Sequence, residues 1–242
     1  MPRFFVSSLA SDTVVISGAD AQHIARVLRV RPGEELTVCD GKGRDARCAV
    51  RTVSADQVVL SVLACAPSAG EARLRAYLYQ GFPKGDKFEW IVQKAVELGA
   101  AEVVPMLTAR CVARPDAAAQ RGKCARYQKI ADEAAKQSGR GRLPQVRPFQ
   151  DFADALGTLP EGALPILFYE QGGRPLRALL AERPLDAVAL FIGPEGGFAP
   201  EEIGRARAAG AQIATLGPRI LRTETAGLCA LSALMFAAGA LD

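Results

Sequence analysis

The second half of the chain alternates short apolar runs with helix-like stretches, and this alternation restricts the possible folds more than any other feature. Strand-like runs at 73–82 and 101–107 enclose a helix-like stretch at 84–100. Three further strand–loop–helix units follow, which read LPILFYEQGG, AVALFIGPEGGFAPEEIGRARAAG and AQIATLGPRILRTETAGLCALSALMFAAG. Apolar strands that alternate with helices are typical of a parallel sheet covered by helices. The sequence therefore predicts an α/β fold for this part of the chain.

Residues 1–70 follow a different pattern, with short strands and frequent turns. A helical stretch at 20–30 interrupts the strands, with Asp20 as its predicted N-cap. The segment 66–72 is rich in small residues and is suited to a linker. The chain of 242 residues is long enough for two domains. The first is predicted to be a small β-barrel-like module with strands at 13–17, 35–40, 46–53 and 57–63.

Cysteine and histidine usage excludes several kinds of site. The six cysteines are scattered without a C-x-x-C pair, so neither a zinc site nor a disulfide framework is predicted. His23 is the only histidine, which argues against a Ser-His-Asp hydrolase and against a site of several histidines. No apolar run reaches the roughly 20 residues of a membrane helix, and no signal peptide is recognised. We expect a cytoplasmic protein that needs no metal ion and no membrane.

Basic residues are concentrated in the middle of the chain. Between residues 109 and 147, ten basic side chains stand against three acidic ones, although the whole chain carries a net charge of only +4. Clustered positive charge is what a nucleic-acid partner requires. A solvated helix face is the alternative explanation, and charge alone does not separate the two.

Three predicted strands end in unusual loops, at 169–173, 193–197 and 217–225. In a parallel sheet, ligands bind beyond the carboxyl ends of the strands. Glycine allows the backbone to approach a ligand closely, and proline stiffens a loop. None of the glycine-containing segments has the spacing of a P-loop or of a dinucleotide-binding turn. The loops therefore favour an adenosine ligand without a polyphosphate. The alternative is that glycine and proline only allow the chain to turn, which would explain a single such loop better than Gly-Pro turns after two successive strands.

The segment LGPRILRTETAGLCALSAL, at 216–234, combines a loop with the start of an apolar helix. Thr223 is a suitable N-cap, and Glu224 in the first turn complements the helix dipole. Arg219 and Arg222 oppose that dipole and need an anionic partner, which Glu224 supplies for only one of them. A phosphate or a nucleotide would supply the second.

Several segments together resemble one known family. LFIGPEGGFAPEEI and LGPRILRTETAG resemble the signature segments of RsmE, the family of 16S rRNA uridine-N3 methyltransferases in the SPOUT superfamily. QHIARVLRVRPGEELTVCDGKG resembles its N-terminal PUA-like domain. KGDKFEWIVQKAVELGAAEVVPMLTARC and YQKIADEAAKQSGRGRLPQVRP resemble the start of its catalytic domain. GPEGG alone is shared with other SPOUT enzymes, whereas its combination with RILRTETA and KAVELG is specific.

The resemblance implies a fold, a cofactor and partners. It implies a PUA-like RNA-binding domain at 1–70 and a SPOUT methyltransferase domain at 73–242, whose parallel sheet ends in a C-terminal trefoil knot. It implies a homodimer, S-adenosylmethionine as methyl donor, and a uridine of 16S rRNA in the 30S subunit as substrate. The cofactor-binding residues implied are Phe168, Tyr169, Glu170, Ile192, Gly193, Pro194, Glu195, Gly196, Gly197, Leu216, Gly217, Ile220, Leu221, Arg222, Thr223 and Ala226.

Uracil N3 is a poor nucleophile until its proton leaves, so the reaction needs a base or a cation beside the base. Arg222 is assigned to anion or phosphate stabilisation, and Glu224 to proton acceptance or to orienting Arg222. Through its matching segments, the resemblance also implies RNA contacts at Arg3, His23, Arg26, Arg29, Lys84, Lys87, Arg110, Gln137, Arg140 and Arg142, with Arg26 and Arg29 at i, i+3 on one helix side. A structural role stays open for His23 and Arg3, and a solvated face for Arg140 and Arg142. Two other readings stay open: an RNA-binding module without catalysis, and an enzyme that modifies tRNA or a ribose 2′-oxygen.

Overall fold

The structure, a computed structural model, describes residues 3–182 and 184–241 and divides into two compact units. Unit 1 comprises the chain up to Glu71 together with Ala135–Leu143. Unit 2 comprises Ala72–Ala134 and the chain from Pro144 onward. The terminal residues of the two predicted domains, Met1 and Asp242, lie outside the described residues. The prediction had assigned 135–143 to the second domain, whereas these residues pack with the N-terminal strands.

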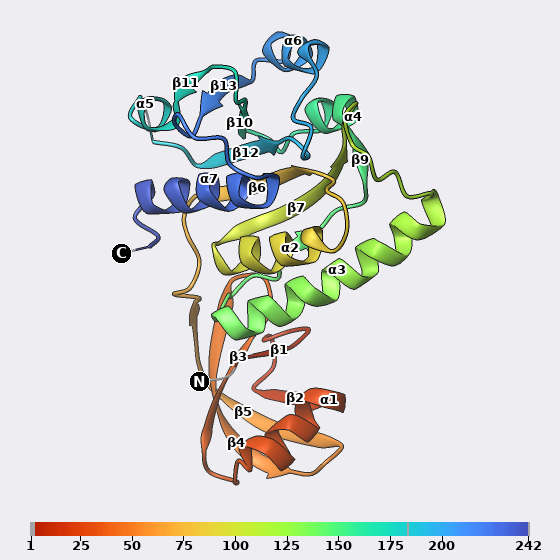
Figure 1. Cartoon of the computed structure of the whole chain (residues 1–242). Coiled ribbons are helices and arrows are strands. Elements are labelled where there is room, and N and C mark those ends of the chain that lie inside the picture. Colours follow the sequence, from red (N-terminus) through yellow and green to blue (C-terminus); the bar gives the residue numbers. More distant parts are fainter. Residues whose placement is uncertain (1–2, 183, 242) are drawn as a thin grey trace. The chain divides into compact units, whose positions relative to one another are not determined.

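Unit 1 is built on a five-stranded sheet in the order β1-β3-β4-β5-β2 (Figure 1). β1 pairs with β3 in parallel, and the other neighbours are antiparallel. In β2, Val14 and Ile16 point into the core while their neighbours are exposed, as expected for a strand with one buried face. All four strands predicted here are present, and the two-residue β1 was not predicted. The elements are β1 (Phe4–Phe5), β2 (Thr13–Ser17), α1 (Gly18–Gln22), η1 (His23–Leu28), β3 (Glu35–Cys39), β4 (Arg44–Val53) and β5 (Gln57–Pro67).

The helical stretch of unit 1 differs from its prediction in two respects. Its N-cap is Ser17, and Asp20 lies in the first turn, where it pairs with Lys136 at 3.1 Å. From His23 the helix widens into a π-helix that ends at Arg29, a residue in the left-handed conformation with φ 52°. The π-helix and its left-handed end replace the α-helical turn on which the predicted i, i+3 alignment of Arg26 and Arg29 was based.

A buried ion pair holds the ends of unit 1 together. Arg140 donates from Nε and Nη2 to the two carboxylate oxygens of Glu71, at 2.9 and 3.0 Å. The backbone amides of Gly141 and Arg142 donate to the same carboxylate at 2.8 and 3.0 Å. Burial opposes ionisation of Glu71, but Arg140 and the two amides outweigh it and lower the pKa of this carboxyl. The pair joins the linker to the segment that follows α3.

This lowered pKa predicts an acid-sensitive contribution to stability. The ionised Glu71 stabilises unit 1 above the ordinary glutamate pKa of about 4.3, and the contribution disappears as the pH falls through the lowered folded-state pKa. We therefore expect the free-energy difference between wild type and Glu71→Gln to shrink in that range, because a protonated carboxyl resembles the amide. Hydrogen exchange in β3 and β4 between pH 3 and 7 measures it. A difference independent of pH would contradict the prediction.

Unit 2 contains a wholly parallel sheet in the order β11-β13-β10-β12-β6-β7-β8, with β9 also paired to β7. The predicted parallel α/β architecture is therefore confirmed. The short elements β8, β9, α4, β11 and α5 were not predicted. The elements are β6 (Arg75–Gly81), α2 (Lys87–Glu97), β7 (Ala100–Leu107), α3 (Ala117–Ser138), β8 (Gln145–Val146), β9 (Gln150–Asp151), α4 (Phe152–Gly157), β10 (Leu164–Phe168), β11 (Arg174–Pro175), α5 (Leu176–Leu180), β12 (Ala187–Ile192), α6 (Pro200–Ala208), β13 (Gln212–Thr215) and α7 (Thr223–Ala237).

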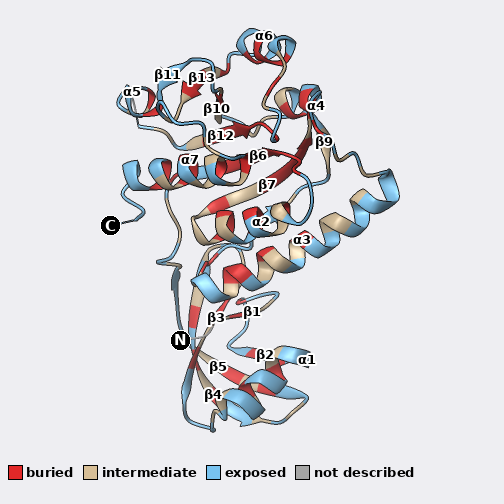
Figure 2. Cartoon of the chain, in the orientation of Figure 1, coloured by how far each residue is buried: buried red, intermediate tan, exposed pale blue. Residues whose placement is uncertain are grey.

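Helices cover both faces of this sheet, which explains why its central strands β6 and β12 are buried at nearly every position (Figure 2). Tyr77 and Tyr79 of β6 pack into a core with α4 and α6. Leu78 and Gln80 alternate with them and face α7, where both lie beside Gly227. α2 packs beside α7 on that face. Within the described residues, no helix has the length and apolarity needed to cross a membrane.

Candidate active site

Three loops of unit 2 form one cavity of about 530 Å³. They follow β10, β12 and β13, which are direct neighbours in the sheet in the order β13-β10-β12. Because the strands are parallel, their carboxyl ends lie at one edge, and the loops converge there. The chain order predicted the three loops, but the neighbouring positions of their strands became visible only in the sheet.

Every residue predicted for cofactor binding lines this cavity, and Glu224 lines it as well. Apolar side chains such as Phe168 and Ile192 share the wall with backbone of the Gly193–Gly197 loop. The prediction did not include Phe198, Thr215 and Pro218, which also line the cavity. These three residues adjoin predicted cofactor-binding residues in the sequence, so extending each predicted stretch by one residue would have included them. A cavity of this size with mixed apolar and main-chain walls is typical of a small-molecule site.

The Gly193–Gly197 loop is fixed by groups from other elements. Glu195 accepts hydrogen bonds from the backbone amide of Lys84 and from Nζ of Lys87, each at 3.2 Å. Burial opposes ionisation of Glu195, but its own amide, the Lys84 amide and Lys87 outweigh this and lower its pKa. Arg110 donates from Nη1 to the carbonyl of Gly196 at 2.9 Å. The loop therefore has a defined shape independent of any ligand.

The structure corrects the predicted role of Thr223. Arg222, with extended φ and ψ of −65° and 153°, occupies the N-cap position, and Thr223 is the first helical residue. Thr223 is buried, and its hydroxyl donates to the carbonyl of Gly193 at 2.6 Å. It therefore ties the start of α7 to the Gly193–Gly197 loop and does not cap the helix.

The partner of Glu224 also differs from the prediction. Glu224 pairs with Lys87 of α2, with Oε2 3.3 Å from Nζ, and not with an arginine. The hydrogen bond to Glu195, and then the ion pair with Glu224, raises the pKa of Lys87, so its ammonium stays charged. Lys87 had been predicted as an RNA contact, but it lines the cavity between two carboxylates.

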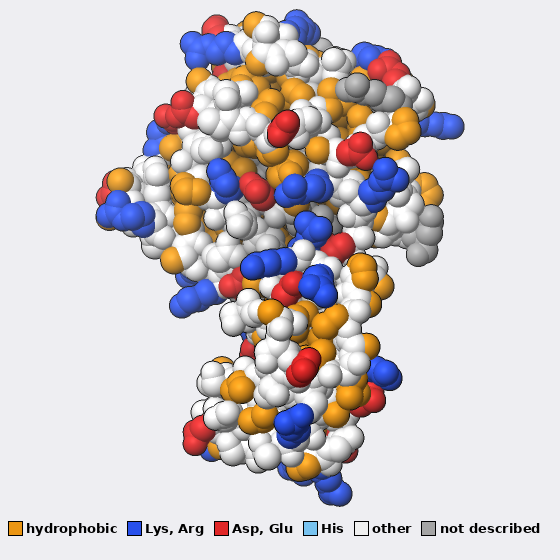
Figure 3. Space-filling model, turned by 180° about the vertical axis from the view of Figure 1, so that it is seen from behind, with side chains coloured by type: hydrophobic (Ala, Val, Ile, Leu, Met, Phe, Trp, Pro, Cys, Tyr) orange, Lys and Arg blue, Asp and Glu red, His pale blue; other side chains and the backbone are white. Residues whose placement is uncertain are grey.

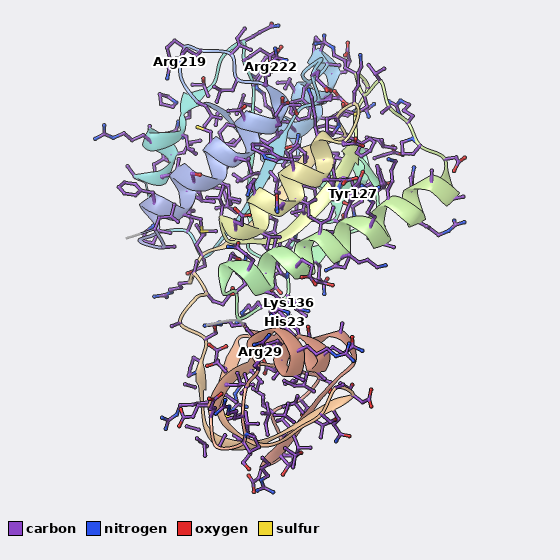
Figure 4. The ribbon with its side chains drawn as sticks, turned by 60° about the horizontal axis from the view of Figure 1, so that its bottom comes forward. His23, Arg29, Tyr127, Lys136, Arg219 and Arg222 are labelled. Atoms are coloured by element: carbon purple, nitrogen blue, oxygen red, sulfur yellow. The ribbon has the colours of Figure 1, made fainter. Side chains whose placement is uncertain are left out.

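Arg219 and Arg222 remain without an anion. Both are exposed and line the cavity, and no hydrogen bond or ion pair of either guanidinium is found among the described residues. Figure 4 shows both at the same end of unit 2, on the loop that leads into α7. The positive end of the α7 dipole adds to their charge. Glu224 serves neither arginine, because it pairs with Lys87, and an external anionic partner for the two arginines stays a prediction.

The predicted RNA contacts of unit 1 fall into two groups. His23, Arg26 and Arg29 are exposed on the helical segment, where Figure 4 labels His23 and Arg29. Gln137, near the end of α3, and Arg142, which follows α3, are also exposed. Arg140 is only 5% exposed and is engaged by Glu71, so its guanidinium is not available to a phosphate. Arg3 pairs with Asp45 at 3.0 Å and has a side chain 18% exposed. Arg140 and Arg3 thus hold the fold of unit 1.

In unit 2, Lys84 and Arg110 are exposed. Their hydrogen bonds to Glu195 and Gly196, which line the cavity, place them beside it. The described part of the face in Figure 3 shows lysine and arginine mixed with acidic and hydrophobic side chains, so no purely basic patch covers that face. Within the described residues, no cluster of three potential ligands could hold a metal ion.

Comparison with known proteins identifies the family. Residues 70–235 match the RNA methyltransferase domain family, and residues 16–63 match the RNA methyltransferase PUA domain family. Ribosomal RNA small subunit methyltransferase E from Bacillus subtilis is 34% identical over 98% of this chain and 96% of its own length. The chain belongs to this family. A Mycobacterium bovis protein of the same name is 33% identical over 96% of the chain and 90% of its own length.

A solved structure supports the assignment of this methyltransferase. Ribosomal RNA small subunit methyltransferase E from Neisseria gonorrhoeae, bound to S-adenosyl methionine, superposes with a TM-score of 0.86 at 33% identity. The alignment covers 98% of this chain and 97% of that protein. The small N-terminal β-unit and the parallel sheet of the methyltransferase thus belong to a shared fold. The predicted family resemblance is confirmed.

Proposed function

We propose that this methyltransferase transfers a methyl group from S-adenosylmethionine to N3 of a uridine in 16S rRNA of the 30S subunit. The convergence of three strand-end loops on one cavity, in a member of the ribosomal RNA small subunit methyltransferase E family, carries the proposal. The neighbour from Neisseria gonorrhoeae, which is bound to S-adenosyl methionine, supports the same cofactor here.

The cavity suits this cofactor chemically. Its inner cation, Lys87, is already neutralised by Glu195 and Glu224, so the interior offers no free positive charge for a polyphosphate. Glycine backbone and apolar walls fit a nucleoside, and the carboxylates tolerate a positively charged ligand. When bound, S-adenosylmethionine supplies an electrophilic methyl group on a sulfonium.

The residues around the cavity have the chemistry that the acceptor requires. In the proposed reaction the N3–methyl bond forms as the methyl–sulfur bond breaks, and the N3 proton has to leave the uracil. Glu224 accepts that proton, and Lys87 holds its carboxylate in place at 3.3 Å. Arg222, exposed and without a partner, stabilises the negative charge that develops on the base. Orientation of Arg222 by Glu224 has no support, because Glu224 pairs with Lys87.

The proposal extends to assembly and RNA contacts. We propose the trefoil knot for the last segment, and a homodimer in the cytoplasm, for which the exposed apolar residues Phe236 and Leu241 at the end of the chain offer contact surface. We propose His23, Arg26, Arg29, Lys84, Arg110, Gln137 and Arg142 as RNA contacts, since all are exposed. Arginine and lysine at such positions bind phosphates and make affinity depend on salt.

The position of the methyl group tests the proposed function. We expect reaction of the purified protein with undermodified 30S subunits and S-adenosylmethionine to place one methyl group on N3 of one uridine of 16S rRNA. Mass spectrometry of nuclease fragments identifies both the nucleotide and the modified atom. A methyl group on a ribose 2′-oxygen, or transfer to tRNA in place of 16S rRNA, would overturn the proposal.

A further inference from the structure

Gln80 is a fully buried polar residue in an otherwise apolar strand. It lies near the end of β6, has an exposed fraction of 0%, and faces α7. It does not line the cavity. Burial of an amide is costly unless its hydrogen bonds are replaced, so its presence requires an explanation.

The Gln80 amide begins a chain of hydrogen bonds that ends at the cavity wall. Its Nε2 donates to Oγ1 of Thr223 at 2.8 Å, and the Thr223 hydroxyl donates to the carbonyl of Gly193 at 2.6 Å. A hydroxyl has one proton, so a hydroxyl that donates to Gly193 can only accept from Gln80. Both Thr223 and Gly193 line the cavity. Buried hydrogen bonds in series strengthen each other.

Two glycines allow the three segments of this chain to meet. A Cβ atom at Gly81 would lie 2.4 Å from the backbone nitrogen of Pro194, so a side chain there has no room. A Cβ atom at Gly227 of α7 would lie 2.9 Å from Oε1 of Gln80. The end of β6 and the Gly193–Gly197 loop are therefore in close backbone contact, and the backbone of α7 at Gly227 lies directly against the Gln80 side chain.

The carbonyl oxygen of the Gln80 amide, Oε1, makes no hydrogen bond that would explain why glutamine occupies this buried position. This oxygen is buried and has no hydrogen-bond partner among the described residues. An unsatisfied buried acceptor destabilises the fold, and an apolar side chain of similar size would avoid that cost. What distinguishes glutamine from leucine here is the donor Nε2, which contacts Thr223 at 2.8 Å and the adjacent Gly81 carbonyl at 3.2 Å. Only the contact to Thr223 reaches the cavity wall.

We propose that Gln80 is a positioning residue for the cofactor: through the Thr223 hydroxyl it fixes the Gly193 carbonyl, and with it the backbone of the Gly193–Gly197 loop. The inference rests on the proposed binding of S-adenosylmethionine in this cavity. Gln80 itself does not touch the cofactor. Its effect is to hold the loop in its binding shape before the cofactor arrives, which reduces the loss of conformational freedom on binding.

Calorimetric binding of S-adenosylmethionine to the full chain tests the proposal. We expect Thr223→Val and Gln80→Leu each to weaken binding by about tenfold, because each interrupts the chain and leaves a buried group unpaired. Thr223→Ser keeps the hydroxyl and should bind within about twofold of wild type. The double variant Gln80→Leu/Thr223→Val should bind little worse than Thr223→Val alone, because residues of one network do not act additively.

Matched variants separate this effect from general destabilisation. Gln128 of α3 also uses its side-chain amide inside unit 2, toward Asp132 and the carbonyl of Pro144. Gln128→Leu should bind S-adenosylmethionine within about twofold of wild type. The same is expected for Thr225→Val, which alters a threonine of α7 outside the Gln80–Thr223–Gly193 hydrogen bonds. Hydrogen exchange of 193–197 without cofactor should rise in Thr223→Val and Gln80→Leu only.

The outcomes are distinguishable. Wild-type affinity in both Thr223→Val and Gln80→Leu, or equal weakening in Gln128→Leu, would overturn the positioning role. Fully additive losses in the double variant would show that Gln80 does not act through Thr223. Absence of binding by the wild-type protein would instead contradict the proposed cofactor.

Discussion

Replacing Glu224 by glutamine is expected to slow methyl transfer by about 10²–10⁴-fold, the usual contribution of a positioned proton acceptor. Glutamine has nearly the same size as glutamate but cannot take the N3 proton. Cofactor binding should change little, because Lys87 keeps its pairing with Glu195 at 3.2 Å. The single-turnover rate with undermodified 30S subunits measures the first effect, and calorimetry the second.

A matched control for this variant lies on α2. Glu97 also pairs with a lysine, with its Oε1 2.7 Å from Nζ of Lys94, but it does not line the cavity. Glu97→Gln should leave the rate unchanged, because it removes a comparable ion pair outside the site. A Glu224→Gln enzyme that binds the cofactor normally and keeps the full rate would remove the proton-acceptor role.

Replacing Arg222 by alanine is expected to slow methyl transfer by about 10²–10³-fold, as loss of one donor to a developing anion does. Arg222 is exposed, lies at the N-cap of α7, and has no partner among the described residues. Its charge is therefore free to act on the uracil. Arg222→Lys should recover part of the rate, because lysine keeps the charge but loses the planar fork. The same single-turnover assay measures both variants.

Two other arginines set the comparison for Arg222. Arg177 of α5 is exposed and does not line the cavity, so Arg177→Ala should leave the rate unchanged. Arg219 is at the rim, and Arg219→Ala should weaken RNA binding and reduce its salt dependence with a smaller effect on the rate. If Arg222→Ala shows only this second pattern, the residue binds phosphate and does not act on the base.

Parts of the site that depend on local sequence could be predicted. Glycine and proline after apolar runs indicated the three loops. Arg219 and Arg222 near the start of a helix indicated a binding site for an anion. Both properties belong to a few consecutive residues. The ion pair of Lys87 with Glu224 could not be predicted, because it joins residues far apart in the chain. The family resemblance therefore placed Lys87 among the RNA contacts, and the helix-dipole argument paired Glu224 with an arginine.

Burial was the second limit of prediction from sequence. Arg140 in a basic segment reads as a phosphate contact, yet its charge is used inside unit 1 by Glu71. Thr223 before an apolar helix reads as a cap, yet it lies one position inside the helix and bonds to Gly193. In both cases the partner lies tens of residues away, and no pattern near either residue indicates it.

The sequence by itself determined the longer strands and helices of this protein, its parallel sheet and its family, because periodicity, turn residues and signature segments are local properties. Tertiary structure alone decided that β13, β10 and β12 are neighbours, so that their three loops enclose one cavity. It also decided which charges are neutralised and which remain free, since only packing brings Lys87 to two carboxylates and leaves Arg222 exposed. A side chain's chemistry depends on its surroundings, and distant segments supply them.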